Sequence, residues 1–290
     1  HRDLNLGCEV VVVGSGAGGG TIAAELAEAG IDVILLEEGG YNTTEDFRPN
    51  AMEAARQLYR DMGTTMTMGL PPVMYQEGCT VGGSSVINGG MSWRTPESIL
   101  DRWHLDHRVD NIRSKEIEPF FDRVAKRIHV NFQDEESHSK DSLILKEGAD
   151  KRGWHIIPNE RNQIHCSGTN NCAFGCPTGA KRSVLVSYIP RALHFGARLY
   201  ANVRVKKINR RGKRATGVEG RVVRRDGTLG RRIKVRANLV ISACGAIHTP
   251  AWLSRSGFKS PSKMIGRNLW LHPNSKVVAV FDKDVRGWQG

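Results

Sequence analysis

Three cysteines close together in the chain are the residues with the most distinctive chemistry. Cys166, Cys172 and Cys176 lie in the stretch CSGTNNCAFGCPTGAK, and a proline follows the last of them. The Gly and Asn residues between them can turn the backbone so that the thiolates converge, and runs that end in Cys-Pro are typical of iron–sulfur loops. An iron–sulfur cluster is one interpretation. Structural cysteines, reduced or in a disulfide, and a zinc site completed by His165 are the alternatives.

A second group of residues is suited to binding a dinucleotide. Gly14, Gly16 and Gly19 form a Gly-x-Gly-x-x-Gly pattern directly after the run CEVVVV. In this pattern the first glycine permits a tight turn, the second lets a pyrophosphate approach the backbone, and the third lets a helix pack closely on a strand. N–H groups at the start of that helix offer hydrogen bonds to the phosphates. The expected phosphate-binding residues are Gly14, Ser15, Gly16, Ala17, Gly18 and Gly19.

An acidic residue follows at the distance that such a site requires. Glu37 directly follows the apolar run IDVILL and stands eighteen residues after Gly19. A carboxylate there accepts hydrogen bonds from a ribose 2′-hydroxyl and repels a 2′-phosphate, which favours FAD or NAD over NADP. Glu38 is the less favoured ribose ligand because Glu37 directly continues the strand. An NAD-dependent dehydrogenase stays an alternative to a flavoenzyme at this point.

These residues must be held by a buried parallel sheet. Residues 10–13, all valine, indicate a strand covered on both faces, and apolar residues then recur at helical spacing as far as Gly30. Residues 31–36 form the next strand, so the order strand, helix, strand predicts a Rossmann-like α/β fold with a parallel sheet. The pattern also predicts a helix over 114–128 and a strand over 277–281.

The composition is that of a soluble globular protein. Of the 290 residues, 39% are apolar and 25% are charged, and the length allows one large domain or two. No stretch approaches the roughly 18 consecutive apolar residues that a membrane-spanning helix needs. Because the chain begins at His1 without an initiator methionine, a few residues before the first strand, we expect it to be a piece of a longer protein.

The positive charge is concentrated in one stretch. Residues 204–236 contain fourteen Lys or Arg against Glu219 and Asp226, so this stretch carries the whole formal charge of +12. Apolar and basic residues alternate there between turns, which predicts an antiparallel meander with one face in water. A solvated sheet face is the first interpretation, and a docking face for an acidic partner is the second. We expect no nucleic acid partner, because the stretch has no aromatic residue to stack on a base.

A second glycine-rich stretch lies at residues 78–94 and reads GCTVGGSSVINGGMSWR. Its backbone donors and small hydroxyls can wrap a flat polar ring. Together with the N-terminal motif, it resembles the glucose-methanol-choline (GMC) family of FAD-dependent oxidoreductases, whose Gly-Gly-Ser-Ser-x-x-Asn loop is matched by residues 82–88. A third family motif is matched by GAIHTPAWLSRSG at residues 245–257, directly after a predicted strand at 237–244. These ordered motifs extend the resemblance over essentially the whole chain.

The resemblance implies a set of cofactor contacts. Beside those of the first motif they are Gly83, Ser84 and Asn88 at the flavin and pyrophosphate, the backbone of Val205 at the adenine, and Ala243 and Gly245 near the adenosine half. Ile87 stands where some relatives carry the histidine that attaches FAD covalently, so the resemblance implies noncovalent FAD. Cys79 stands where relatives often have Arg or Lys, which puts one phosphate contact in doubt.

The resemblance also implies an enzyme that oxidises a CH–OH group. Family members transfer hydride from an alcohol or sugar to flavin N5 while a histidine of a C-terminal segment accepts the hydroxyl proton. This chain ends at Gly290 before such a segment, so we name no catalytic residue and expect the chain alone to bind FAD poorly and not to turn over. Isolated histidines such as His248 and His272 are more often structural groups than bases. A non-catalytic flavin-binding electron-transfer subunit is the alternative.

The cysteine stretch is similar to a segment of dehydrogenase catalytic subunits of this family. In those subunits, cysteines hold a three-iron, four-sulfur cluster that passes electrons from the flavin to a cytochrome. The resemblance therefore implies that Cys166, Cys172 and Cys176 are cluster ligands and that the electron acceptor is a protein such as a cytochrome. The basic stretch 204–236 would then be its docking face. Nothing in the sequence indicates a compartment.

The predicted domains interleave along the chain. They are residues 1–100, the FAD-binding domain with the flavin loop; 101–198, a substrate-side helical region with the cysteine stretch; 199–272, the second part of the FAD-binding domain; and 273–290, the start of a truncated substrate domain. No clean linker separates them, so the two domains are expected to exchange chain segments.

Overall fold

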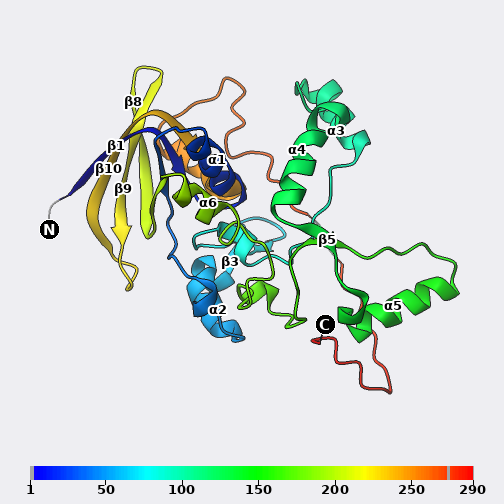
Figure 1. Ribbon diagram of the computed structural model, residues 1–290. Helices are drawn as coiled ribbons and strands as arrows, with labels where there is room; N and C mark the ends of the chain where they lie inside the picture. The colour runs from blue at the N-terminus through cyan, green and yellow to red at the C-terminus, as the bar shows by residue number, and fades with distance from the viewer. Residues whose placement is uncertain (1–2, 273–274, 290) are drawn as a thin grey trace. The chain divides into compact units, whose positions relative to one another are not determined.

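The computed structural model describes residues 3–272 and 275–289 (Figure 1). The chain forms two compact units, each built from several segments. The first holds residues up to 87 together with 173–177 and 184–280, and the second holds 88–172, 178–183 and the chain from 281 onward. The sequence predicted divisions after residues 100, 198 and 272, and residues 273 and 274 lie outside the described part. Naming the two units an FAD-binding and a substrate domain stays a prediction.

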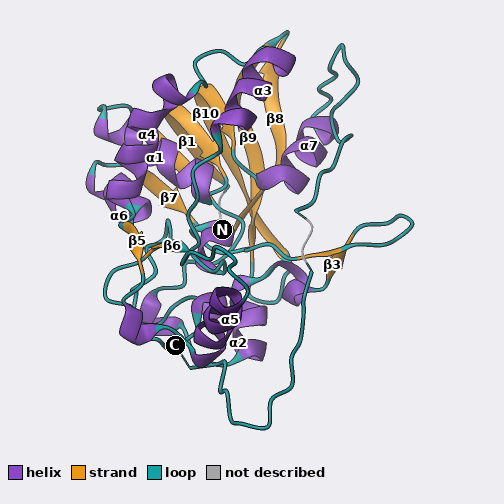
Figure 2. Ribbon diagram, turned by 90° about the vertical axis from the view of Figure 1, so that its right-hand side faces the viewer, coloured by secondary structure: helices purple, strands orange, loops and turns teal. Residues whose placement is uncertain are grey.

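A six-stranded sheet lies at the centre of the first unit, in the order β7-β2-β1-β10-β9-β8 (Figure 2). Its strands are β1 (Leu4–Val13), β2 (Val33–Leu36), β7 (Arg198–Tyr200), β8 (Val203–Arg211), β9 (Arg214–Val223) and β10 (Leu229–Ser242). Strands β7, β2, β1 and β10 run parallel, whereas β10, β9 and β8 form an antiparallel meander. This confirms the predicted α/β fold with a parallel sheet and a meander.

The parallel part of the sheet is buried where the sequence is continuously apolar. Residues 10–13 of β1 are 0% to 6% exposed and pair with residues 33–36 of β2 on one side and with β10 on the other. A continuous apolar run of this kind is typical of a strand that is covered on both faces. The carboxyl ends of β1 and β2 therefore meet at one edge of the sheet, directly before the first glycine motif and Glu37.

The α-helices of the first unit, in the described residues, are α1 (Ala17–Glu28), α2 (Ala51–Leu58), α6 (Tyr188–His194) and α7 (Gly245–Arg255). Helix α1 buries a face of Gly and Ala, which lets it approach its neighbours closely. A Cβ at Gly20 would lie 2.3 Å from Val184 Cγ1, just before α6. Helix α7 buries Trp252 in the same core as Val11, Ile34 and Val235. A short hairpin, β3 (Thr65–Met66) and β4 (Met74–Tyr75), completes this unit.

The second unit is mainly helical. Its helices are α3 (Glu97–His107), α4 (Ser114–Arg127) and α5 (Lys140–Lys151), and its hairpin is β5 (Val130–Phe132) with β6 (Glu160–Asn162). Helix α4 confirms the helix predicted over 114–128. In the part of the chain that the structure describes, no helix combines the length and the apolar character needed to cross a membrane.

The strand predicted over 277–281 is wrong. Residues 275–289 contain no strand, and Val277, Val278 and Val280 are 95%, 85% and 95% exposed. A β-strand needs a hydrogen-bonded neighbour, and a periodic apolar pattern does not supply one.

The charged meander was predicted correctly, because Ile233, Val235 and Ala237 are buried while the basic residues between them are exposed. The prediction of one face in water is therefore confirmed.

Candidate cofactor-binding site

A cavity of about 540 Å³ opens beside the carboxyl end of β1, within the first unit. This is the edge where open α/β sheets bind their ligands, and the volume lies in the usual range of small-molecule sites. Its walls come from residues 13–18, the end of β2 at 36–38, Arg60, Glu77, Gly78, residues 83–85, Val203, Val205, residues 242–245, His248 and Thr249. Segments that are far apart in the sequence therefore line one space.

The β1–α1 turn forms one wall, and its glycines differ in what they do. Gly14 has φ +96°, and a Cβ there would lie 2.3 Å from the Ala243 carbonyl oxygen. A Cβ at Gly19 would lie 1.8 Å from the Gly14 oxygen, so this glycine permits the packing of helix on strand and does not line the cavity. Gly16 precedes α1 without a side-chain cap, which leaves the first N–H groups of the helix for a ligand.

The second glycine-rich loop forms the facing wall. Its residues 83–86 make a short 3-10 helix, η3, after Gly82 at φ +94°. The Gly82 N–H donates to Ser15 Oγ at 3.1 Å, and a Cβ on Gly83 would lie 2.7 Å from Gly16 Cα. The two glycine loops are therefore in contact, and both line the cavity. A pyrophosphate would meet backbone on two sides in such a cradle.

The serines of this loop have different roles. Ser85 Oγ donates to the Gly82 carbonyl at 2.6 Å and accepts from the Val184 N–H at 3.0 Å, so it holds the loop in shape. Ser84 Oγ accepts from the Gly78 N–H at 2.9 Å. A hydroxyl that accepts one bond can still donate its own hydrogen, so Ser84 remains able to donate toward the cavity that it lines.

Glu37 lies at the bottom of the cavity and is 7% exposed. Its Oε2 accepts from the Ser15 N–H at 2.9 Å and the Ser15 hydroxyl at 2.7 Å, and its Oε1 accepts from the Gly39 N–H at 2.8 Å. Burial raises the pKa of Glu37, and these three hydrogen bonds oppose that rise. Among the described residues Oε1 has a single donor, so it can accept one more hydrogen bond, as from a ribose hydroxyl.

Glu38 also lines the cavity, and it is held by two guanidinium groups. Arg60 Nη1 lies 3.2 Å and Arg204 Nε 2.7 Å from Glu38 Oε1. Burial opposes ionisation of Glu38, but the two arginines outweigh it and hold its pKa below the ordinary value. The glutamate that the sequence disfavoured as a ribose ligand is thus part of an ion-pair network.

That network contains residues that the sequence analysis did not connect. Arg60 Nε and His248 Nε2 each lie 2.5 Å from Glu77 Oε1. Burial opposes ionisation of Glu77, whereas His248 and Arg60 stabilise the carboxylate and lower its pKa. Glu77 directly precedes the second glycine-rich stretch and His248 lies in the third motif, but no spacing rule links them to Arg60. Only the fold brings the three to one cavity.

Cys79 lies close to this network. Burial raises the pKa of its thiol to about 12, and nearby Arg60 opposes the rise. The residue is therefore an uncharged thiol at neutral pH, and it cannot replace the Arg or Lys expected at this place from the resemblance. Arg60, which comes from a different part of the chain, places a cation on the cavity wall beside it.

The remaining predicted contacts fall into two groups. Val205, Ala243 and Gly245 line the cavity, and Gly245 begins α7 at φ +74° without a side-chain cap, so a second helix N-terminus opens onto the same space. Asn88 belongs to the second unit, where its carbonyl accepts from Lys181 Nζ at 2.7 Å. Its contact with a flavin stays a prediction.

The structure describes the surroundings of each cysteine of the 166–176 stretch. Cys166 and Cys172 belong to the second unit and Cys176 to the first, where it is 6% exposed. Arg161 Nη2 lies 3.0 Å from Cys172 Sγ, so a guanidinium occupies one approach to that thiol. Within residues 3–272 and 275–289, no three His, Cys, Asp or Glu side chains form a metal-binding group. None of the six cysteines, all of them in described residues, forms a disulfide.

Two models of known protein families match this chain. The family model described as GMC oxidoreductase matches residues 55–274, and the model described as FAD binding domain matches residues 9–58. An uncharacterized GMC-type oxidoreductase of Sinorhizobium fredii is 36% identical over 289 residues, which cover 100% of this chain and 56% of that relative. A long-chain-alcohol oxidase of Arabidopsis thaliana is 32% identical over 277 residues, 92% of this chain and 36% of the oxidase.

A solved structure shows the same fold. An FAD-dependent oxidoreductase from Chaetomium thermophilum matches with a TM-score of 0.68 at 17% sequence identity, over 90% of this chain and 50% of that one. The chain spans about half the length of the first curated relatives that it matches, 56% and 44%.

Proposed function

The chain belongs to the GMC oxidoreductase family, and on that premise we propose that it binds one noncovalent FAD for the oxidation of a CH–OH group. One observation carries the proposal: both glycine-rich loops and two uncapped helix N-termini line a single cavity. Helix N-termini and backbone N–H groups favour a pyrophosphate, which carries negative charge. The match to an FAD-binding domain favours FAD over NAD.

The residues present fit such a cofactor. Glycine at positions 14, 16 and 83 keeps the backbone within reach of phosphate oxygens, since side chains there would fill or distort the cradle. Glu37 Oε1, which accepts one hydrogen bond from Gly39, would accept a second from the ribose, and the backbone of Val205 would meet the adenine. Arg60 offsets the negative charge of Glu38 and Glu77 on the cavity wall. Bound FAD would supply the hydride acceptor for the alcohol carbon.

We infer alcohols as the substrate class, and a long-chain alcohol is the first to test because several relatives are named long-chain-alcohol oxidases. Purified protein loaded with FAD is mixed anaerobically with the alcohol, and flavin absorbance is followed. Bleaching by the alcohol supports an alcohol oxidoreductase. Stable oxidised flavin with this chain, but bleaching with a longer polypeptide that contains it, supports the expectation that the proton acceptor lies outside residues 1–290. Oxidised flavin in both would favour the alternative of a non-catalytic electron-transfer subunit.

The identity of the electron acceptor stays a prediction, with two candidates. One is oxygen, and the other is a protein such as a cytochrome that docks on residues 204–236. The predicted iron–sulfur cluster at Cys166, Cys172 and Cys176 would pass electrons to the protein acceptor. The arrangement of the described side chains does not support this cluster. Iron and labile-sulfide analysis with EPR on anaerobically purified protein tests it. Iron well below one equivalent per chain would end the cluster prediction.

A further inference from the structure

A second cavity lies in the first unit, and no function has been assigned to it above. Its volume is also about 540 Å³, and its lining shares no residue with the cofactor cavity. The two lie toward opposite ends of β1, since Gly7 and Cys8 line the second and Val13 lines the first. Val13 lies five positions after Cys8 in this strand, which is about 16 Å along the sheet.

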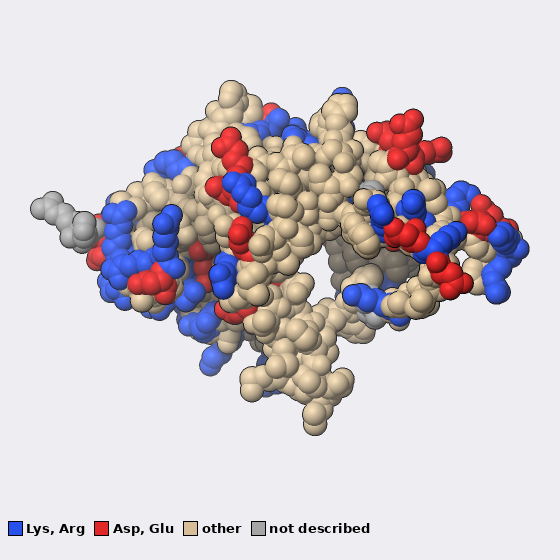
Figure 3. Space-filling view, turned by 90° about the horizontal axis from the view of Figure 1, so that it is seen from below, with Lys and Arg blue, Asp and Glu red and all other residues tan. Residues whose placement is uncertain are grey.

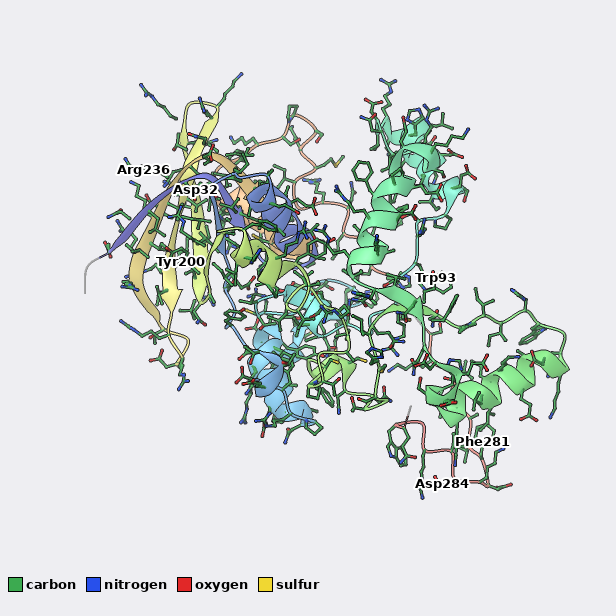
Figure 4. The ribbon with its side chains drawn as sticks, viewed as in Figure 1. Asp32, Trp93, Tyr200, Arg236, Phe281 and Asp284 are labelled. Carbon is green, nitrogen blue, oxygen red and sulfur yellow. The ribbon has the colours of Figure 1, made fainter. Side chains whose placement is uncertain are left out.

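Three arginines from three strands surround this hollow. The β8–β9 hairpin sets Arg211 opposite Arg214, and β10 contributes Arg236, which pairs in register with Gly7 of β1 and Gly217 of β9. Figure 4 labels Arg236 on this sheet. A Cβ at Gly217 would lie 2.0 Å from the Val235 carbonyl oxygen, so the close approach of β9 to β10 depends on that glycine. The strand register of the meander therefore fixes the positions of the backbone from which the three arginine side chains extend.

The floor between them is small and uncharged. Cys8, Ala215 and Ala237 leave the hollow open, and Thr216 and Asn238 add one hydroxyl and one amide. Burial raises the pKa of the Cys8 thiol to about 11, so it carries no charge at neutral pH. No Asp or Glu is among the lining residues that the structure describes. Its lining is thus positively charged.

Two other cations of the same stretch are held in ion pairs. Arg204 is paired with Glu38 and Lys234 with Glu219, whereas no carboxylate in the described residues pairs with Arg211, Arg214 or Arg236. All three are exposed, so they are hydrated and available. Figure 3 shows Lys and Arg gathered over the meander, at the left of the view. Such a field raises the local concentration of anions.

We propose that this cavity binds a small organic polyanion that carries phosphate or carboxylate groups. Guanidinium groups form bidentate, charge-assisted hydrogen bonds with both kinds of oxyanion. The absence of aromatic residues among the lining residues argues against a stacked nucleobase. The site is separate from the FAD cavity, so it can be occupied whether or not FAD is bound.

The test uses pyrophosphate and citrate as probes, in separate titrations by isothermal calorimetry on FAD-saturated protein. Prior saturation with FAD keeps pyrophosphate out of the first cavity. We expect one saturable site. Its Kd should rise about tenfold or more in Arg236→Gln and in the double variant Arg211→Gln/Arg214→Gln. The probe that binds more tightly distinguishes a phosphate from a carboxylate ligand.

Arg231→Gln is the matched control. Arg231 is an exposed arginine of the same strand that does not line the cavity, so its loss removes equal charge. Thermal unfolding of each variant checks that the meander is intact. Binding that weakens equally in Arg231→Gln and Arg236→Gln, or no saturable binding of either probe, would overturn the proposal. If the protein binds no FAD, the same arginine variants still separate the two cavities, so this inference and the proposed function fail independently.

Discussion

The N–H of Gly82 donates a hydrogen bond to the hydroxyl of Ser15 at 3.1 Å, across 67 residues of sequence. The same hydroxyl donates to Glu37 at 2.7 Å, so one buried side chain joins the β1–α1 turn, the second glycine loop and the acid at the end of β2. All three belong to the wall of the cofactor cavity. The shape of that cavity therefore depends on a side chain for which the glycine pattern itself has no requirement.

Replacing Ser15 by Ala should loosen this junction. Glu37 Oε2 would lose one of its two donors and the Gly82 N–H its acceptor, both in buried surroundings. We expect a loss of about 1–3 kcal/mol in the free energy of unfolding, measured by urea denaturation. Ser254→Ala, at an exposed position of α7, is the control and should change little. Equal stability of the two variants would contradict the role of Ser15.

The contact between the two glycine loops can be tested at Gly83. An alanine there would place its Cβ 2.7 Å from Gly16 Cα in a backbone of φ +54°, so the loops must separate. Gly212 has a similar φ of +59° but open space around it, so Gly212→Ala carries the backbone strain alone. We expect Gly83→Ala to cost about 1–3 kcal/mol more than Gly212→Ala in thermal or urea unfolding. Similar costs would show that loop contact is unimportant.

Arg60 should matter for cofactor affinity. Its removal leaves the carboxylates of Glu38 and Glu77 without their shared cation, on a wall that would face the pyrophosphate of bound FAD. We expect Arg60→Gln to weaken FAD binding about tenfold or more, measured by quenching of flavin fluorescence. Arg56→Gln, an exposed arginine of α2, is the control. Unchanged FAD affinity in Arg60→Gln would contradict a role for Arg60 at the site.

The same carboxylates predict how stability depends on pH. Glu38 and Glu77 have folded-state pKa values below the ordinary 4.5, so below pH 4.5 the unfolded chain takes up their protons before the folded chain does. The free energy of unfolding should therefore fall as pH decreases from 4.5 through these lowered values. The contribution of Glu37 to this pH dependence has the opposite sign, because its pKa is raised. Its contribution to the free energy of unfolding falls as pH rises from 4.5 through the raised value.

Urea denaturation across this acid range measures the effect. Glu77→Gln should show a shallower loss of stability below pH 4.5 than the unmodified chain, since one of the groups that titrates there is gone. The exposed Glu53→Gln should keep the original slope. An unchanged slope in Glu77→Gln would contradict the assignment.

Much of the fold followed from sequence because local and global signals agreed. Residues 10–13 and 33–36 are apolar without interruption, and they form neighbouring buried strands. The alternation of basic and apolar residues in β10 likewise fixed which face is wet. The strand predicted at 277–281 failed because apolar alternation gives no information about a pairing partner.

The site was predictable only where its residues belong to contiguous motifs. Gly14, Gly83 and Gly245 could be named because each lies in a contiguous motif, and the structure gives each of them a positive φ. Arg60, Glu77 and His248 could not be connected, because their contacts depend on how distant segments fold together. A role for Glu37 could be predicted from its place after the strand, but nothing in the sequence indicates that it is only 7% exposed.

Titration of the purified chain with FAD shows whether the two glycine loops bind one cofactor between them. We expect saturable binding of one FAD per chain, however weak, that is at least tenfold weaker in Gly83→Ala than in Gly212→Ala. Such a result means that both glycine loops hold one cofactor. Absence of FAD binding to a folded chain, or equal affinity in the two glycine variants, would contradict it.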